Sequence, residues 1–129
     1  MAKEWGGGGG AKLVAPPPTL QMRMEPRELH WKAEGGLQGV SIANASDTRR
    51  AIKVKCSDNL LYRVNPVYSF VEAGESVRID VLRQHGAAKT DKIVVVAAEA
   101  NKEDDDASMA VKRQAKPEMM VLPLLTVAQ

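Results

Sequence analysis

The chain has 129 residues, and its 18 basic and 16 acidic side chains give a formal net charge of +2 at pH 7. This length suits a single domain, and so small a charge argues against a nucleic-acid binder that attracts phosphate by its overall field. Aromatic residues make up only 4% of the chain, so aliphatic side chains must fill the core, as β-rich domains allow. A lone cysteine, Cys56, excludes an internal disulfide, and with no apolar secretory signal it favours a reducing cytosol.

The first 18 residues differ in composition from the rest. Five consecutive glycines occupy positions 6–10 and three prolines occupy positions 16–18. The glycines leave the backbone too flexible to pack, and the prolines hold it in an extended conformation that does not pack either. We therefore predict a flexible tail over residues 1–18, serving either as a tether or as an inert leader, and a folded domain over residues 19–129.

Strict alternation of apolar and polar residues begins at Leu20, with Met22 and Met24 on the same side. It resumes after Pro26 with Leu29 and Trp31. Period-2 alternation is typical of a half-buried strand, and a proline inside such a pattern favours a sheet edge. The pattern predicts one kinked edge strand.

Residues 52–57 alternate most clearly. Apolar side chains fall on one phase and polar side chains on the other: Ile52, Val54 and Cys56 against Lys53, Lys55 and Ser57. Successive side chains of a strand point to opposite faces, so both lysines lie on one solvent face. That face is either an ordinary solvated strand surface or a docking face for acidic partners.

Further along the chain, Pro66 ends one short strand and redirects the next. Alternation at 77–81 and a continuous apolar run at 93–98 predict two more strands. Residues 103–114 begin with acidic and end with basic residues, which fits the dipole of a short helix. Residues 119–127 read as a buried terminal strand. Seven or eight short strands at this spacing predict an all-β sandwich.

No set of residues for catalysis or metal binding can be assembled from the sequence. Cys56 shares the inward phase of its strand, which favours a buried small hydrophobe over a nucleophile. His30 and His85 are far apart, and neither has partners at metal-ligand spacing. We therefore predict a protein that is not an enzyme and that has no catalytic residues, no cofactor and no metal site.

Four short motifs, in this order, resemble the major sperm protein domain. They are MEPREL at 24–29, IKVKCS at 52–57, YRVNP at 62–66 and VEAGESV at 71–77. The resemblance covers residues 20–127 and is nearest to the small sperm-specific and fibre accessory proteins of nematodes. It implies a seven-stranded immunoglobulin-like β-sandwich that acts in protein assembly without nucleotide or metal.

Major sperm protein itself polymerises into the filaments that drive amoeboid sperm, and related domains regulate that fibre. The resemblance therefore implies a cytoplasmic component or regulator of the sperm cytoskeleton, whose partners are filament or fibre proteins or further copies of the chain. Whether it polymerises, dimerises or caps filaments depends on the symmetry of its contacts and stays open.

A second branch of the family, the membrane-contact adaptors of the VAP type, binds acidic, phenylalanine-containing peptides on a lysine-rich strand. Lys53, Lys55 and Lys92 match its lysines, whereas Cys56 and Ser57 replace its paired threonines and Val94 replaces a methionine. The alternative hypothesis is thus a soluble peptide-binding adaptor. The predicted protein-binding or peptide-binding residues are Lys53, Lys55, Ser57 and Lys92.

Overall fold

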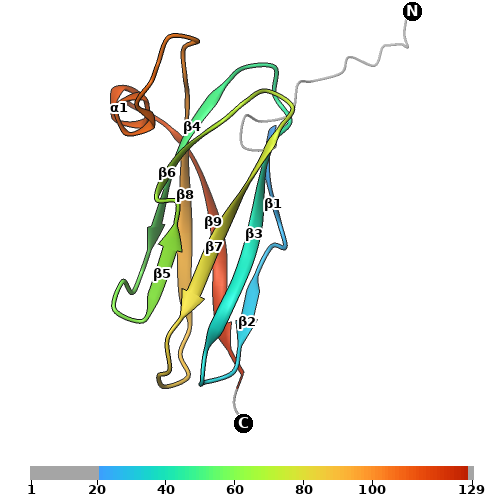
Figure 1. The fold of residues 1–129 in the computed structure, drawn as a ribbon, viewed down its shortest axis with the longest axis vertical. Coiled ribbons are helices and arrows are strands. Elements are labelled where there is room, and N and C mark those ends of the chain that lie inside the picture. Colours follow the sequence, from blue (N-terminus) through green and yellow to red (C-terminus); the bar gives the residue numbers. More distant parts are fainter. Residues whose placement is uncertain (1–20, 128–129) are drawn as a thin grey trace, which may run out of the picture.

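A computed structural model describes residues 21–127 as two β-sheets with one short helix (Figure 1). The four-stranded sheet has the order β1-β3-β7-β5 and the five-stranded sheet the order β2-β9-β8-β4-β6. The elements are β1 Met22–Glu25, β2 Leu29–Trp31, β3 Gly36–Asn44, β4 Arg50–Cys56, β5 Tyr62–Asn65, β6 Tyr68–Val71, β7 Ser76–Arg83, β8 Asp91–Glu99, α1 Ala107–Arg113 and β9 Glu118–Thr126. The predicted tail at 1–18 lies outside the described residues, so its boundary at residue 18 stays a prediction.

The core lies between the two sheets. Side chains on the inward phase of the strands are almost fully buried, including Ile42, Ile52, Leu122 and Leu124. Burying one such side chain contributes roughly 1.5–3 kcal/mol. Trp31 and Tyr62 pack edge to face with ring centroids 5.3 Å apart, and the indole nitrogen of Trp31 donates to the carbonyl of Gly36. The predicted all-β immunoglobulin-like sandwich is confirmed.

The described residues contain nine strands, whereas the spacing predicted seven or eight and the resemblance implied seven. The difference from the spacing arises at Pro26, because a proline lacks an N–H for the ladder and separates two short strands there. On either side of Pro26, β1 pairs with β3 while β2 pairs in parallel with β9 of the other sheet. The prediction of a single kinked edge strand is therefore wrong. Pro66 likewise separates β5, paired with β7, from β6, paired with β4.

The helix α1 begins later than the predicted residue 103. The side chain of Asp106 caps it by accepting hydrogen bonds from the backbone N–H groups of Ser108, at 3.0 Å, and Met109, at 3.4 Å. The earlier acidic residues lie outside the helix. Asp104 instead pairs with Arg113 at 2.7 Å, and this hydrogen bond lowers the pKa of Asp104 to about 2. The helix is therefore stabilised by the Asp106 cap and the Asp104–Arg113 ion pair, and not by acidic residues in its first turn.

The apolar side of α1 packs on the outer face of the five-stranded sheet. Ala110 and Val111 are buried against Ala51 of β4 and Val96 of β8. In Figure 1 the helix lies beside the ends of β4 and β6. It therefore covers only one part of that outer face.

Arg83, at the end of β7, is one of the most buried side chains, with 1% of its surface exposed. Its guanidinium donates hydrogen bonds to carbonyl oxygens of Ala33 at 2.8 Å and Ala87 at 2.7 Å, and longer ones to Gln84 and Gly86 at 3.3 Å. It thereby ties the loop after β7 to the turn after β2. Removing a buried donor leaves such carbonyls without partners, which is costly.

We expect Arg83→Met to lower the free energy of unfolding by about 2–4 kcal/mol, because several carbonyls lose their donor. Arg78→Met is the matched control on the same strand. Arg78 is 65% exposed and pairs only with Asp80 in the described residues, so its loss should cost less than about 1 kcal/mol. Urea unfolding of both variants measures the difference. Equal effects would contradict the structural role of Arg83.

Candidate functional site

The outer face of the five-stranded sheet carries lysines beside apolar side chains where α1 does not cover it. Register brings residues from three strands together: Lys55 of β4 lies opposite Val94 of β8, and Val94 lies opposite Val121 of β9. One step along, Lys92 lies opposite Pro123. We call this surface the lysine face and define it as Lys53, Lys55, Ser57, Lys92, Val94, Met119, Val121 and Pro123.

The apolar part of the lysine face is open to solvent. Met119 is 57% exposed and Val121 is 54% exposed. The prediction that residues 119–127 form a buried strand is therefore wrong for the outward phase of β9, while Leu122 and Leu124 on the inward phase are fully buried. Exposed apolar side chains grouped on one surface often mark a protein-interaction site.

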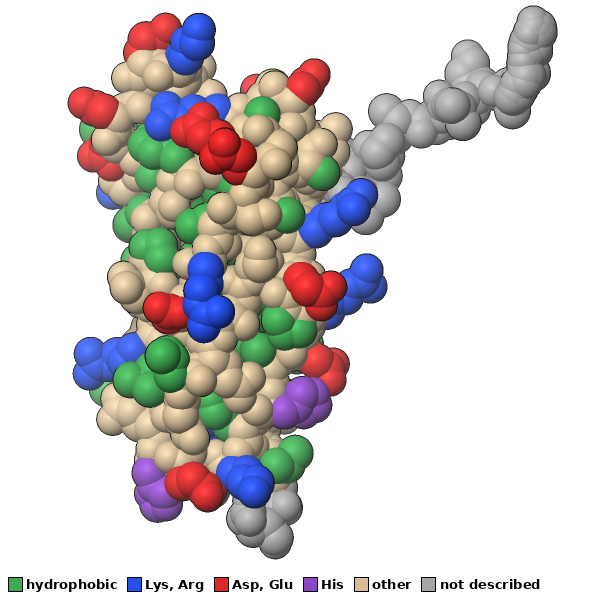
Figure 2. Space-filling model, turned by 45° about the vertical axis from the view of Figure 1, so that its right-hand side comes forward, with side chains coloured by type: hydrophobic (Ala, Val, Ile, Leu, Met, Phe, Trp, Pro, Cys, Tyr) green, Lys and Arg blue, Asp and Glu red, His purple; other side chains and the backbone are tan. Residues whose placement is uncertain are grey.

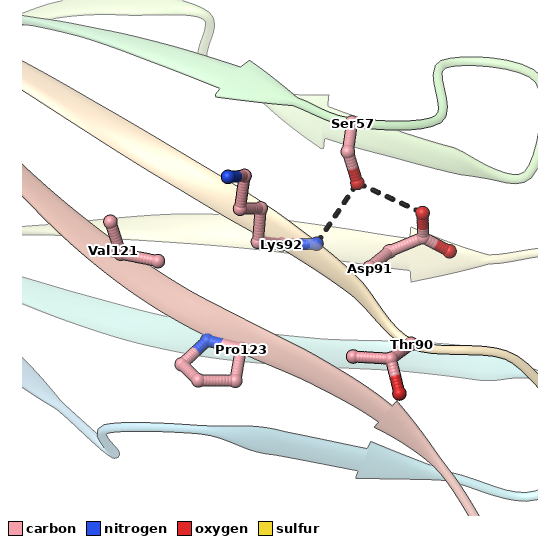
Figure 3. Close-up of a pocket in the computed structure, with 6 residues that line it drawn as sticks. All are labelled: Ser57, Thr90, Asp91, Lys92, Val121 and Pro123. Carbon is pink, nitrogen blue, oxygen red and sulfur yellow. Dashed lines mark hydrogen bonds between the residues drawn. The ribbon is translucent and has the colours of Figure 1, made fainter.

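A shallow pocket of about 370 Å³ lies at one end of the lysine face. Its lining comes from three neighbouring strands and the residues next to them: Ser57, Thr90, Asp91, Lys92, Val121 and Pro123 (Figure 3). Val121 and Pro123 form an apolar wall, and Lys92 brings the positive charge. This combination suits an apolar or aromatic group that lies next to a carboxylate.

Hydrogen bonds fix the polar side of the pocket. The hydroxyl of Ser57 donates to Asp91 at 2.9 Å and accepts from the backbone N–H of Lys92 at 3.0 Å (Figure 3). The ammonium of Lys89 bridges Asp91 at 2.7 Å and Asp58 at 2.8 Å. One ammonium thus pairs with two carboxylates, so Lys89 offsets only part of the charge of Asp91. Lys92 supplies the positive charge among the residues that line the pocket.

The same bridge shifts the pKa values of Asp58 and Lys89. The hydrogen bond from Lys89, helped by backbone N–H donors of Leu61 and Leu60, lowers the pKa of Asp58 below its ordinary value. Asp58 and Asp91 together raise the pKa of Lys89. Both shifts keep the Asp58 carboxylate and the Lys89 ammonium charged at neutral pH, so the ion pair beside the pocket persists.

The structure places the four residues predicted for binding on one face. Lys55 is exposed, whereas Lys53 is half-buried with its ammonium 5.5 Å from the ring centroid of Tyr68. Ser57 lies beside Lys92, joined by the bond from the Ser57 N–H to the Lys92 carbonyl at 3.0 Å. Their role in binding stays a prediction.

Sequence reasoning missed the apolar half of the face. Met119, Val121 and Pro123 alternate with Met120, Leu122 and Leu124, and all six are apolar or proline. With both phases apolar, the two sides of β9 could not be distinguished. Pro123 gave no signal either, because the N–H that a proline lacks lies in the plane of the sheet and does not distinguish its two faces.

Cys56 lies at the end of β4, half-buried against the core. Burial raises the pKa of its thiol above the ordinary value, which keeps the sulfur protonated and poorly nucleophilic at neutral pH. Residues 21–127 hold no group of three or more His, Cys, Asp or Glu side chains that could bind a metal ion. In the same range no helix is both long and apolar enough to cross a membrane.

Charge is mixed elsewhere on the surface. The view in Figure 2 shows Lys and Arg side chains close to Asp and Glu side chains, with small separate apolar patches between them. The fold and surface together define an immunoglobulin-like β-sandwich whose lysine face combines positive charge with exposed apolar side chains.

Comparison with known proteins identifies the family. The MSP (major sperm protein) domain model matches residues 21–120. Sperm-specific class P protein 34 of Caenorhabditis elegans is 36% identical over 104 residues, covering 81% of this chain and 97% of that protein. Sperm-specific class P protein 32 of the same organism is 37% identical, covering 74% and 89%. The chain belongs to the major sperm protein domain family.

Comparison with solved structures supports the same family. WR4, described as a C. elegans MSP family member, superposes with a TM-score of 0.78 at 35% identity, covering 83% of this chain and 98% of that chain. The periplasmic chaperone SfaE superposes with a TM-score of 0.65 at 9% identity, which shows a shared fold alone. The resemblance drawn from the motifs is thereby confirmed.

We expect Lys89→Met to raise the pKa of Asp58 toward its ordinary value of 3.8, because the main donor to that carboxylate is removed. A carboxyl whose folded pKa is lowered stabilises the fold above its unfolded pKa and loses this effect as pH falls through the folded pKa. In the variant, the part of acid stability that depends on Asp58 should therefore shrink, and the backbone N–H donors of Leu60 and Leu61 should retain the rest. Carboxyl ¹³C titration measures the pKa, with Lys92→Met as control. No change in the Asp58 titration would refute the bridge.

Proposed function

We propose that this chain is a non-enzymatic protein-interaction domain of the cytoskeleton that major sperm protein builds in nematode sperm, and that it docks through the lysine face. The open apolar strip of Met119, Val121 and Pro123 beside three lysines is the observation that carries this proposal. Relatives named sperm-specific support the cellular setting, which we take to be the sperm cytoplasm.

The surface indicates the chemistry of the partner. Docking on the apolar strip removes about 25 cal/mol of unfavourable hydration per Å² of apolar surface. Lysines at the margin attract carboxylates and speed encounter more than they add to the final affinity. The partner surface should therefore place apolar side chains among acidic ones, on a filament subunit or an accessory protein of the fibre.

A second candidate is a peptide-binding adaptor of the VAP type. The pocket of Ser57, Lys92, Val121 and Pro123 favours it, since it is sized for one side chain rather than for a broad filament surface. An acidic linear peptide would place an apolar or aromatic side chain there and carboxylates against Lys53, Lys55 and Lys92. The two candidates use one surface but differ in the form of the ligand.

We expect the chain to co-sediment with fibres of major sperm protein and to change their growth rate in an assembly reaction. The double variant Lys53→Glu with Lys55→Glu should lose this association, because it reverses the charge at the margin of the apolar strip. Lys32→Glu with Lys116→Glu changes the net charge equally at exposed positions elsewhere, and it should still associate. Absence of co-sedimentation together with an unchanged growth rate would rule out the cytoskeletal role.

For the adaptor role, calorimetric titration with an acidic, phenylalanine-containing peptide is the measurement. Charge reversal at Lys53 and Lys55 should weaken binding about tenfold or more, equal to roughly 1.4 kcal/mol, and the affinity of the parent chain should fall with added salt. The Lys32 and Lys116 control should keep its affinity. If the Lys53 and Lys55 variant binds as tightly as the parent, the adaptor role is wrong.

A further inference from the structure

We infer that the pocket of the lysine face has a ligand within the same chain: Glu4 and Trp5, which enter the pocket and compete with partners. This inference rests on the proposed function of that face, because only a docking surface gives such competition a consequence. Three features support it: the chemistry of the pocket, the composition of the first 20 residues, and the point where that segment joins the domain.

An indole next to a carboxylate matches the pocket. Val121 and Pro123 offer an apolar wall on which a flat aromatic ring can pack. The ammonium of Lys92 can approach the ring face or pair with an adjacent carboxylate. Lys89, 2.7 Å from Asp91, offsets part of the repulsion between Asp91 and that carboxylate.

Trp5 is the only aromatic residue of the chain outside residues 21–127, and Glu4 is the only acidic residue before Gln21. The four other aromatic side chains already have partners. Trp31 and Tyr62 pack against each other in the core, while Tyr68 lies under Lys53 and Phe70 under Arg49. Within this chain, Glu4 and Trp5 are therefore the one acidic and aromatic pair free to act as a ligand.

The segment joins the domain close to the pocket. Arg50 donates to the side chain of Gln21 at 3.1 Å and to that of Glu118 at 2.9 Å, so Gln21 lies beside the first residue of β9. Val121 and Pro123 follow on the same strand, roughly 10–17 Å along β9 at a rise of about 3.3 Å per residue. Glu118 is on the inward side of β9 and they are on the outward side, so the segment must also pass from one side of the sheet to the other, a further distance of about 10 Å.

The linker length suits this distance. A chain of 16 residues leads from Trp5 to Gln21. A glycine-rich chain of that length has a typical span of about 20–24 Å, and the three prolines at positions 16–18 lengthen it. When the span of a linker matches the distance between sites, the local concentration of the ligand reaches about the millimolar range. A dissociation constant of about 0.1–1 mM would then fill the pocket half or more of the time and weaken an outside partner by roughly twofold to tenfold.

Acrylamide quenching of tryptophan fluorescence on the full chain tests the inference. Trp31 is buried, at 4% exposure, and it is present in every variant, so subtracting the Trp5→Ala signal isolates Trp5. We expect the quenching constant of Trp5 to be about half or less of that in Val121→Glu, which removes the apolar wall and repels Glu4. Leu37→Glu alters a similarly exposed strand residue, 62% exposed, on the other sheet, and should leave Trp5 protected.

Glu4→Lys provides a variant outside the described domain, so folding of the sandwich cannot account for its effect. It should increase quenching of Trp5 and shift the amide resonances of Lys92 and Val121 but not that of Leu37. Equal quenching in the parent chain, Val121→Glu and Glu4→Lys would overturn the inference. So would protection that rises with protein concentration, since a second copy would then supply the ligand.

Partner binding separates this inference from the proposed function. Trp5→Ala should bind major sperm protein fibres about twofold to tenfold more tightly than the parent chain. If both bind equally and both depend on Lys53 and Lys55, the proposed function holds and self-occupancy is wrong. If Trp5 is instead protected from quenching while fibre binding does not depend on Lys53 and Lys55, then Glu4 and Trp5 occupy the pocket, and the docking role of the lysine face is wrong.

Discussion

Packing of the two sheets against each other decides which side chains reach the surface. Side chains of a strand alternate between faces, so burial of Ile52 and Val54 forces Lys53 and Lys55 outward. The same rule turns Val121 outward because Leu122 is buried. A slip of one residue in β4 would bury Lys53 and Lys55, and a slip in β9 would bury Val121 and expose Leu122. The register of the strands therefore determines both which side chains form the apolar core and which ones reach the surface.

The helix α1 then divides the outer face into a covered and an uncovered part. Ala110 and Val111 shield Ala51 and Val96, whereas no element in residues 21–127 covers Met119 or Val121. The helix has only seven residues, too few for stability on its own, so its cap at Asp106 and its packing are needed. The extent of the lysine face thus depends on where a marginally stable helix ends.

Much of the architecture could be predicted from the sequence, because local alternation identifies strands and their faces. The phase of residues 52–57 was enough to place both lysines of β4 outward. Strand partners could not be predicted, since alternation does not encode pairing, and the crossing at Pro26 between sheets was read as a kink. The outward face of β9 could not be identified from the sequence, because the side chains on both of its faces are apolar or proline.

Arg83 shows a different limit of prediction from sequence. It continues the inward phase of Ile79 and Val81, but a charged residue at the end of a strand ordinarily faces water. Its burial depends on carbonyls of the turn after β2 and of the loop after β7, which only the tertiary structure brings together. For the residues predicted to bind, the sequence indicated the charges, and the structure added the apolar wall and the pocket beside them.

The position of β9 bears on how the protein is made in the cell. This strand, the last of the nine in the chain, lies inside its sheet between β2 and β8, and β2 has no other partner strand in the described residues. During synthesis the earlier strands must therefore leave the ribosome with the edge of β8 unpaired and Leu29 uncovered. The five-stranded sheet can close only after residues 118–126 emerge, so until then the nascent chain is exposed to edge-to-edge association and to chaperones.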